Sequence, residues 1–138
     1  MTTRIFMLAA AMFFSTAGLG YQGQAYAQEK HTTDSLETVK KNLAEGKAIL
    51  LDVREKSEWD AGHLKLAKLL PSSRFVDPDK HKEIAEKELD KKLIIYTYCK
   101  AGGRCARVAE YLRPLGYDVR ALKPGYEELL KNGFEKGD

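Results

Sequence analysis

The sequence predicts a single α/β domain with a mainly parallel central sheet. Two patterns predict this class. Short apolar runs alternate with amphipathic segments of helical periodicity, and no hairpin-type turn signal connects one apolar run to the next. The run at residues 48–53 is apolar at almost every position, which is typical of a strand buried on both faces of a parallel sheet.

Strands and helices are expected in alternation along the chain. The strands are expected at residues 48–53, 67–70, 93–98 and 117–122. The helices are expected at about residues 36–45, 57–61, 79–89, 104–114 and 126–131. One of residues 33–35 can cap the first helix, and Gly46 can end it. The strand at residues 93–98 is the clearest, because it is richest in β-branched and aromatic residues.

Residues 1–27 have the pattern of a secretory signal peptide. Arg4 is their single charge, residues 5–14 are apolar, and Ala-Tyr-Ala ends the segment. Cleavage after Ala27 would remove 27 of the 138 residues and leave 111, about one domain. We therefore expect a periplasmic or secreted protein with a flexible lead-in at residues 28–34 and one domain at residues 35–134.

An uncleaved membrane anchor is the alternative interpretation of the same segment. A helix that spans a bilayer requires about 20 predominantly apolar residues. Here the apolar run gives way to Gly, Ser, Thr and Gln after Phe14. With either interpretation, the folded domain is expected outside the cytoplasm.

Charge and histidine patterns argue against two classes of function. The net charge is +3, and basic and acidic residues are interspersed, so no nucleic-acid-binding face is expected. His31 and His81 have no potential ligands at metal-site spacing, so we expect no metal site, and no cofactor is implied. A domain of this length can bury its own core, and a monomer is expected.

Cys99 directly follows the clearest strand and precedes a helix. Ligands of parallel sheets bind at the carboxyl ends of the strands, where helix N-terminal amides are available. Gly102 and Gly103 allow the connecting loop to turn its N–H groups toward an anion. These amides, together with the cations Lys100 and Arg104, are expected to lower the pKa of Cys99 below the free value of about 8.5. The predicted anion-binding loop consists of Lys100, Ala101, Gly102, Gly103 and Arg104.

The length of this loop indicates which group is transferred. Cys99 and Arg104 form a C-x4-R pattern, whereas phosphate-transferring cysteine enzymes use C-x5-R to surround a tetrahedral phosphoryl group. A loop that is one residue shorter closes around a smaller group, about the size of one added sulfur atom. The spacing therefore favours transfer of sulfane sulfur, with Cys99 as the nucleophile.

These motifs resemble those of the single-domain rhodaneses, which are thiosulfate or polysulfide sulfurtransferases. Residues 51–55, 58–59 and 62–64 resemble the family's amino-terminal signature. Residues 98–104 resemble its C-x-x-G-x-R active-site loop, and residues 115–117 and 125–126 resemble its carboxy-terminal part. The resemblance covers about residues 35–134. It implies a rhodanese-like three-layer α/β/α fold in which Cys99 carries the sulfur as a persulfide.

Three polar residues of the amino-terminal signature are expected to support the site. Asp52 resembles a member of the family's structural ion pair. Arg54 has two open roles, loop support and bidentate contact with an anionic substrate. His63 is expected to hold the turn after Gly62 by hydrogen bonds. Lys100 is likewise open between substrate attraction and plain solvation.

The sequence departs from the family at a few positions. Lys65-Leu66-Ala67 stands in place of the usual Pro-Gly-Ala, and Pro124 stands in place of a glycine before Gly125. Cys105 occupies the position after the loop arginine, which is often a serine. Two roles are open for Cys105: a small buried residue, or a redox partner that resolves the Cys99 persulfide or protects Cys99 as a disulfide.

The sequence therefore predicts a sulfurtransferase that implies no cofactor. Cys99 takes a sulfur from a small anionic donor, thiosulfate or a polysulfide, and passes it to cyanide, a thiol or a protein acceptor. Two alternatives stay open. One is a phosphatase or arsenate reductase of the same fold, which the loop length disfavours. The other is a non-catalytic sulfur-carrier or redox-interaction module.

Overall fold

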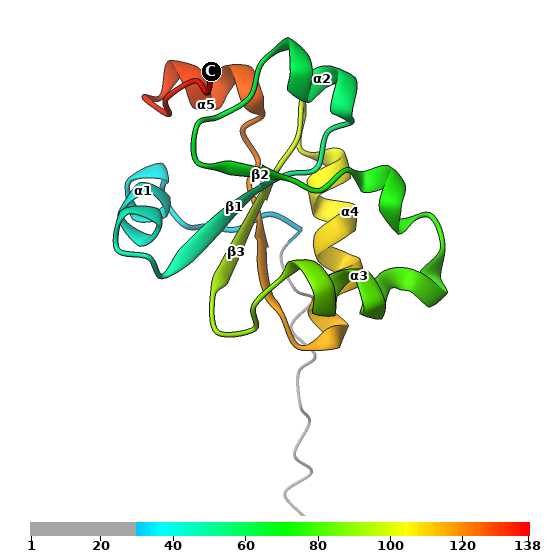
Figure 1. Ribbon diagram of the computed structural model, residues 1–138. Helices are drawn as coiled ribbons and strands as arrows, with labels where there is room; N and C mark the ends of the chain where they lie inside the picture. Colours follow the sequence, from blue (N-terminus) through cyan, green and yellow to red (C-terminus); the bar gives the residue numbers. More distant parts are fainter. Residues whose placement is uncertain (1–29) are drawn as a thin grey trace, which may run out of the picture.

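Four parallel strands form the centre of the computed structural model (Figure 1). They are β1 (Ala48–Asp52), β2 (Ala67–Leu69), β3 (Ile94–Tyr98) and β4 (Asp118–Ala121). The strand order is β2-β1-β3-β4, and each neighbouring pair is parallel. The predicted α/β class is confirmed, and the sheet is parallel throughout.

The structure describes residues 30–138. The predicted signal peptide at residues 1–27, its cleavage point and the start of the lead-in lie outside the described residues. Within the described part of the chain, no helix combines the length and the apolar character needed to cross a bilayer.

Helices cover both faces of the sheet and complete three layers (Figure 1). The α-helices are α1 (Leu36–Ala44), α2 (Lys56–Ala61), α3 (His81–Glu88), α4 (Gly103–Leu112) and α5 (Tyr126–Lys131). Three short 3-10 helices are η1 (Ser72–Phe75), η2 (Pro78–Lys80) and η3 (Arg113–Leu115). Helices α3 and α4 pack on one face of the sheet, and α1 and α5 pack on the other.

The strands supply two separate cores because successive side chains point to opposite faces of a sheet. Leu51 of β1 and Ile95 of β3 pack with α3 and α4. Their neighbours Leu50 and Tyr96 pack with α1 and α5. All four side chains are buried. This two-sided burial explains why residues 48–53 are apolar at almost every position.

Some elements begin or end differently from the sequence-based expectation. The charged helix expected from about residue 79 begins as the 3-10 turn η2, and α3 starts only at His81. His81 itself is buried; its Nε2–H donates to the carbonyl of Phe75 at 2.7 Å, and its ring stacks on Tyr111. A histidine buried by tertiary contacts cannot be identified from an apolar periodicity. Strand β2 is also shorter than expected and ends at Leu69.

A buried ion pair connects the carboxyl end of β1 to its surroundings. The Asp52 carboxylate accepts hydrogen bonds from Nε and Nη2 of Arg54, the latter at 2.7 Å, and from the Tyr98 hydroxyl at 2.7 Å. Arg54 Nη2 also donates to the carbonyl of Gly62, and the guanidinium lies 4.2 Å from the ring centroid of Tyr126. The pair therefore joins β1, β3, α2 and α5.

We expect Asp52→Ala to lower the free energy of unfolding by about 3–5 kcal/mol, because it leaves the buried Arg54 guanidinium without its counter-charge. Urea unfolding followed by circular dichroism measures the loss. Asp60→Ala is the matched control, since it removes an exposed carboxylate from Lys56 and should cost less than about 1 kcal/mol. Similar small losses in both variants would contradict a structural role for Asp52.

Candidate active site

Cys99 lies at the carboxyl end of β3, where the chain turns into α4. The helix begins at Gly103, one residue earlier than the sequence indicates. Gly102 has a φ of 90°, a left-handed conformation that favours glycine. Gly125 packs against this loop so closely that a Cβ atom there would lie 1.7 Å from the carbonyl oxygen of Lys100. The loop is therefore shaped by glycines at two separate points of the chain.

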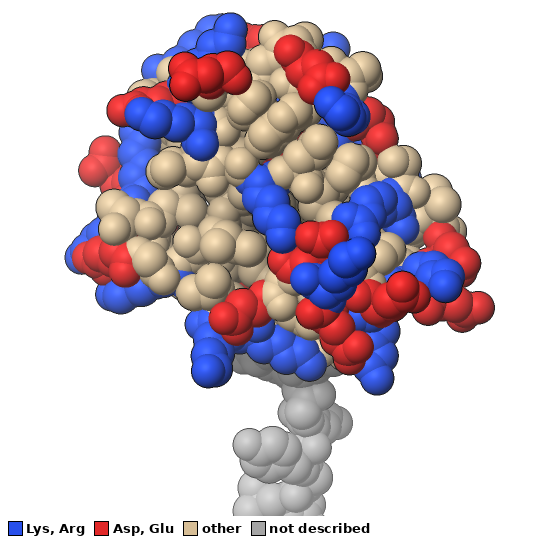
Figure 2. Space-filling view, viewed as in Figure 1, with Lys and Arg blue, Asp and Glu red and all other residues tan. Residues whose placement is uncertain are grey.

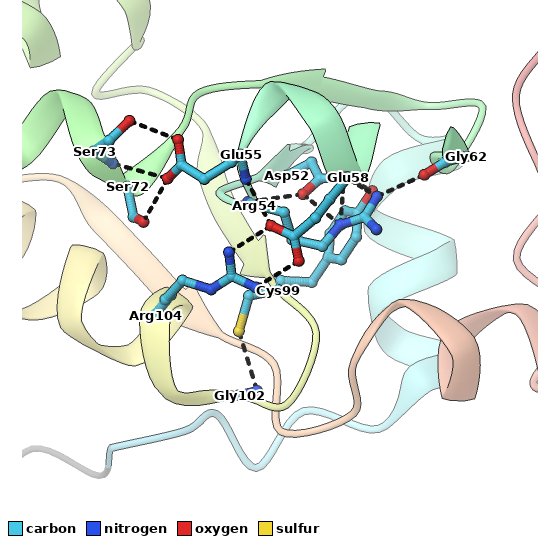
Figure 3. A network of polar contacts seen from close by, with 11 residues as sticks. Asp52, Arg54, Glu55, Glu58, Gly62, Ser72, Ser73, Cys99, Gly102 and Arg104 are labelled. Carbon is cyan, nitrogen blue, oxygen red and sulfur yellow. Dashed lines mark hydrogen bonds and ion pairs between the residues drawn. The ribbon is translucent and has the colours of Figure 1, made fainter. Parts of the chain in front are cut away.

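The Cys99 side chain accepts a hydrogen bond from the loop and has a lowered pKa. The N–H of Gly102 donates to Cys99 Sγ at 3.1 Å (Figure 3). The pKa of Cys99 falls to about 5, chiefly because of the Cys105 side chain; burial opposes this shift, and backbone N–H groups at Cys105, Ala101 and Gly102 add to it. Cys99 is therefore a thiolate at neutral pH, although its residue is only 1% exposed.

The cause of the lowered Cys99 pKa differs in part from the sequence-based expectation. The amides contribute as predicted, but the largest contribution comes from the Cys105 side chain and not from Lys100 or Arg104. Lys100 lies exposed on the loop. Arg104 is engaged by a carboxylate of α2, which offsets its charge.

Cys105 is a fully buried free thiol in the first turn of α4. Its Sγ lies 3.3 Å from the carbonyl oxygen of Gly102 and 3.4 Å from that of Leu122. The neighbouring Cys99 side chain raises the pKa of Cys105 well above the ordinary thiol range, and burial adds to this shift. The structure thus pairs a thiolate at Cys99 with a protonated thiol at Cys105.

Glu58 holds Arg104 through two hydrogen bonds. Nη1 and Nη2 of Arg104 donate to the two carboxylate oxygens at 2.6 and 2.9 Å (Figure 3). This contact is the main reason that the pKa of Glu58 is lowered to about 2. Glu58 also accepts from the N–H of Glu55 and so caps α2. Glu58 belongs to the amino-terminal signature, but its pairing with Arg104 depends on a contact between segments that are distant in the sequence.

Glu55 connects the start of α2 to η1. Its carboxylate accepts hydrogen bonds from both the N–H and the hydroxyl of Ser73 and from the hydroxyl of Ser72 (Figure 3). A carboxylate with this many donors needs no further counter-charge. Glu55 therefore ties η1 to the start of α2, the helix whose Glu58 holds Arg104.

Two histidines have structural positions near the site. His63 stacks on Trp59 with ring centroids 3.7 Å apart, and its Nδ1–H donates to the Trp59 carbonyl at 3.1 Å. These contacts are of the kind expected if His63 holds the turn after Gly62. His31 Nε2–H donates to the Gly102 carbonyl at 2.7 Å. The sequence placed His31 in a flexible lead-in, because no local pattern signals a contact that spans 71 residues.

The support residues at and just after the end of β1 are buried. Asp52 and Arg54 are 0% and 5% exposed, and they bind each other and the Gly62 carbonyl. Of the two roles left open for Arg54, the geometry favours loop support. Among residues 30–138, no group of three or more His, Cys, Asp or Glu side chains is arranged to hold a metal ion.

The matches to known proteins agree with this geometry. The model of the rhodanese-like domain matches residues 35–132. The chain belongs to the rhodanese-like domain family. The resemblance noted from the sequence motifs is thereby confirmed.

Solved rhodanese-like structures share the fold. The human single-domain sulfurtransferase TSTD1 is 28% identical, with a TM-score of 0.58 over 72% of this chain and 95% of that one. The rhodanese-like domain of an Anabaena protein is 25% identical, with a TM-score of 0.62 over 80% of each chain.

Curated relatives are named for a different activity. The tRNA uridine(34) hydroxylase of Staphylococcus saprophyticus is 37% identical over 65% of this chain and 28% of that protein. The corresponding protein of Staphylococcus carnosus is 36% identical over 70% of this chain and 30% of that protein. This rhodanese-like chain thus spans less than a third of the length of either relative.

Replacement of Cys105 tests its part in forming the thiolate. Cys105→Ala removes the side chain that contributes most to the lowered pKa of Cys99, and should raise this pKa from about 5 toward the free value of about 8.5. Cys105→Ser supplies a hydroxyl donor and should keep the pKa low. The pH dependence of Cys99 alkylation by iodoacetamide, followed by mass spectrometry, measures both effects.

Cys99→Ser is the control for this measurement. Because Cys105 is fully buried, and burial by itself raises its pKa, the control should show no rapid alkylation near neutral pH. An unchanged Cys99 pKa in Cys105→Ala would mean that the backbone amides alone stabilise the thiolate.

Proposed function

We propose that this protein is a sulfurtransferase that moves sulfane sulfur through a persulfide on Cys99. The observation that carries the proposal is the position of Cys99, which is buried at the end of β3 and accepts a hydrogen bond on Sγ from the N–H of Gly102 at 3.1 Å, with its pKa lowered to about 5. A thiolate with a lowered pKa is a ready nucleophile. The same donors can stabilise the negative charge of an anionic sulfur donor as it arrives.

The first half-reaction loads the sulfur. The Cys99 thiolate attacks the outer sulfur of thiosulfate, the S–S bond of thiosulfate breaks, and sulfite leaves with the bonding electron pair. Cys99 then carries an anionic persulfide, whose outer sulfur takes over the loop's hydrogen-bond donors. A polysulfide donor reacts in the same way and leaves one sulfur shorter. Lys100, exposed at the loop, is suited to attract these anions.

The second half-reaction returns the thiolate. A nucleophile such as cyanide attacks the outer sulfur of the persulfide, the S–S bond breaks, and Cys99 leaves as the thiolate while thiocyanate forms. Neither half-reaction requires a proton from a general acid, because each leaving group departs as a stabilised anion. This explains why the proposal assigns no catalytic base to His63.

Two other activities are less well supported by the site. Phosphate transfer by the same fold is disfavoured by the short Cys99–Arg104 loop. Hydroxylation of a tRNA uridine is the named activity of the two staphylococcal relatives, of which this chain spans about 28–30%. We do not propose it here, because the Cys99 site by itself supports sulfur chemistry. Export to the periplasm or medium stays a prediction from residues 1–27.

Intact-mass spectrometry combined with a thiosulfate:cyanide assay tests the proposal. Thiosulfate should add about 32 Da, the mass of one sulfur atom, to the wild type and to Cys105→Ser. Cyanide should remove this mass with formation of thiocyanate. Cys99→Ser should show neither the adduct nor turnover.

Each remaining outcome identifies an alternative. Thiocyanate formation that survives Cys99→Ser would overturn the proposal. Hydrolysis of p-nitrophenyl phosphate that depends on Cys99 would restore the phosphatase. An adduct that forms normally but is not released to small acceptors would favour the sulfur-carrier module.

A further inference from the structure

A cavity of about 250 Å³ lies beside the active-site loop, between η1 and α4. Its lining includes Ser72, Phe75, Val76, Arg104, Arg107 and Tyr111. Arg104 belongs both to this cavity and to the Cys99 loop, so the cavity adjoins the site of sulfur transfer. We call it the side pocket. The half-reactions described above leave it without a role.

The side pocket has an apolar wall. Phe75 and Val108 contribute to this wall and are nearly fully buried, and Tyr111 is partly exposed. Val76 at the rim is 81% exposed, one of two large exposed hydrophobic side chains in the described part of the chain. Covering such surface with an apolar ligand chain is favourable, because it removes the surface from water.

The charges around the side pocket leave one cation available. The Glu55 carboxylate accepts hydrogen bonds from Ser72 and Ser73, and the Arg104 guanidinium donates to Glu58. Arg107 lies one turn of α4 beyond Arg104 and is exposed, and it has no carboxylate partner among residues 30–138. A guanidinium in this position can bind a carboxylate through two parallel hydrogen bonds.

We propose that the side pocket binds the sulfur acceptor, and that this acceptor is a small thiol with an apolar chain and a terminal carboxylate. The chain would lie along Phe75, Val76 and Tyr111, with the carboxylate on Arg107 and the thiol near Cys99. The cavity is smaller than the roughly 300–1,000 Å³ typical of pockets for drug-sized ligands, which suits a short chain. This inference rests on the proposed function, since it assigns the partner of the second half-reaction.

The transfer balances without a further reactant. The acceptor thiolate attacks the outer sulfur of the Cys99 persulfide, and a new S–S bond forms between acceptor and transferred sulfur. The old S–S bond breaks, and its electron pair returns to Cys99 as the thiolate. The product is a persulfide of the acceptor, so no external oxidant or reductant is consumed.

A matched pair of acceptors tests the proposal. 6-Mercaptohexanoate and 6-mercaptohexanol share the chain and the thiol and differ in the carboxylate. With thiosulfate as donor, sulfite release gives kcat/KM for each thiol. The wild type should prefer the carboxylate, and Arg107→Gln should reduce this preference about tenfold, as expected for loss of a charge-assisted contact. Val76→Ser should raise KM for both thiols.

Lys87→Gln is the matched control, because it removes one exposed positive charge of α3 outside the side pocket. It should leave the preference at its wild-type value. A preference that is equal in wild type and Arg107→Gln overturns the proposal. So does an equal loss in Arg107→Gln and Lys87→Gln, which would show only a long-range charge effect.

A binding measurement keeps this test separate from that of the proposed function. Hexanoate has the chain and carboxylate without the thiol, so its binding requires no sulfur transfer. Chemical shifts of backbone amides at Val76, Arg107 and Tyr111 should change on its addition to wild type and much less in Arg107→Gln. Absence of the persulfide adduct would refute the proposed function, whereas unchanged amide shifts would refute the side pocket as an acceptor site.

Discussion

The stabilisation of a thiolate inside the protein is the constraint on which the rest of the site depends. Burial of a charge is costly unless nearby dipoles replace the lost water. Here the peptide groups on either side of Gly102 serve both cysteines: its N–H donates to Cys99, and its carbonyl lies next to the thiol of Cys105. The same carbonyl accepts a hydrogen bond from His31. One glycine therefore connects the nucleophile, its neutral partner and the lead-in segment.

Contacts from two strands and from α5 keep this loop in place. Asp52, Arg54 and Tyr98 form a buried network at the ends of β1 and β3, and the N–H of Tyr126 donates to the Cys99 carbonyl. Gly125 lies directly against the loop. Because these contacts come from β1, β3 and the start of α5, the site is a property of the packed domain and not of the loop alone.

Charge at the site is organised locally, and the net charge of +3 says little about it. Arg104 and Glu58 neutralise one another, and Glu55 is held by two serines. Basic and acidic side chains are likewise mixed over the face shown in Figure 2. Cations that remain available, Lys100 on the loop and Arg107 on α4, lie where an anionic donor and an anionic acceptor would approach.

The sequence by itself determined the α/β class, the order of the elements, the family and the position of Cys99 at a strand end. It did so because alternating apolar runs, glycine spacing and the C-x4-R pattern are local features of the chain. Only the tertiary structure decided the partners of the site residues. The contacts of Arg104 with Glu58 and of His31 with Gly102 join segments 46 and 71 residues apart. Such contacts depend on how helices and loops pack around the sheet, and no local pattern records that packing.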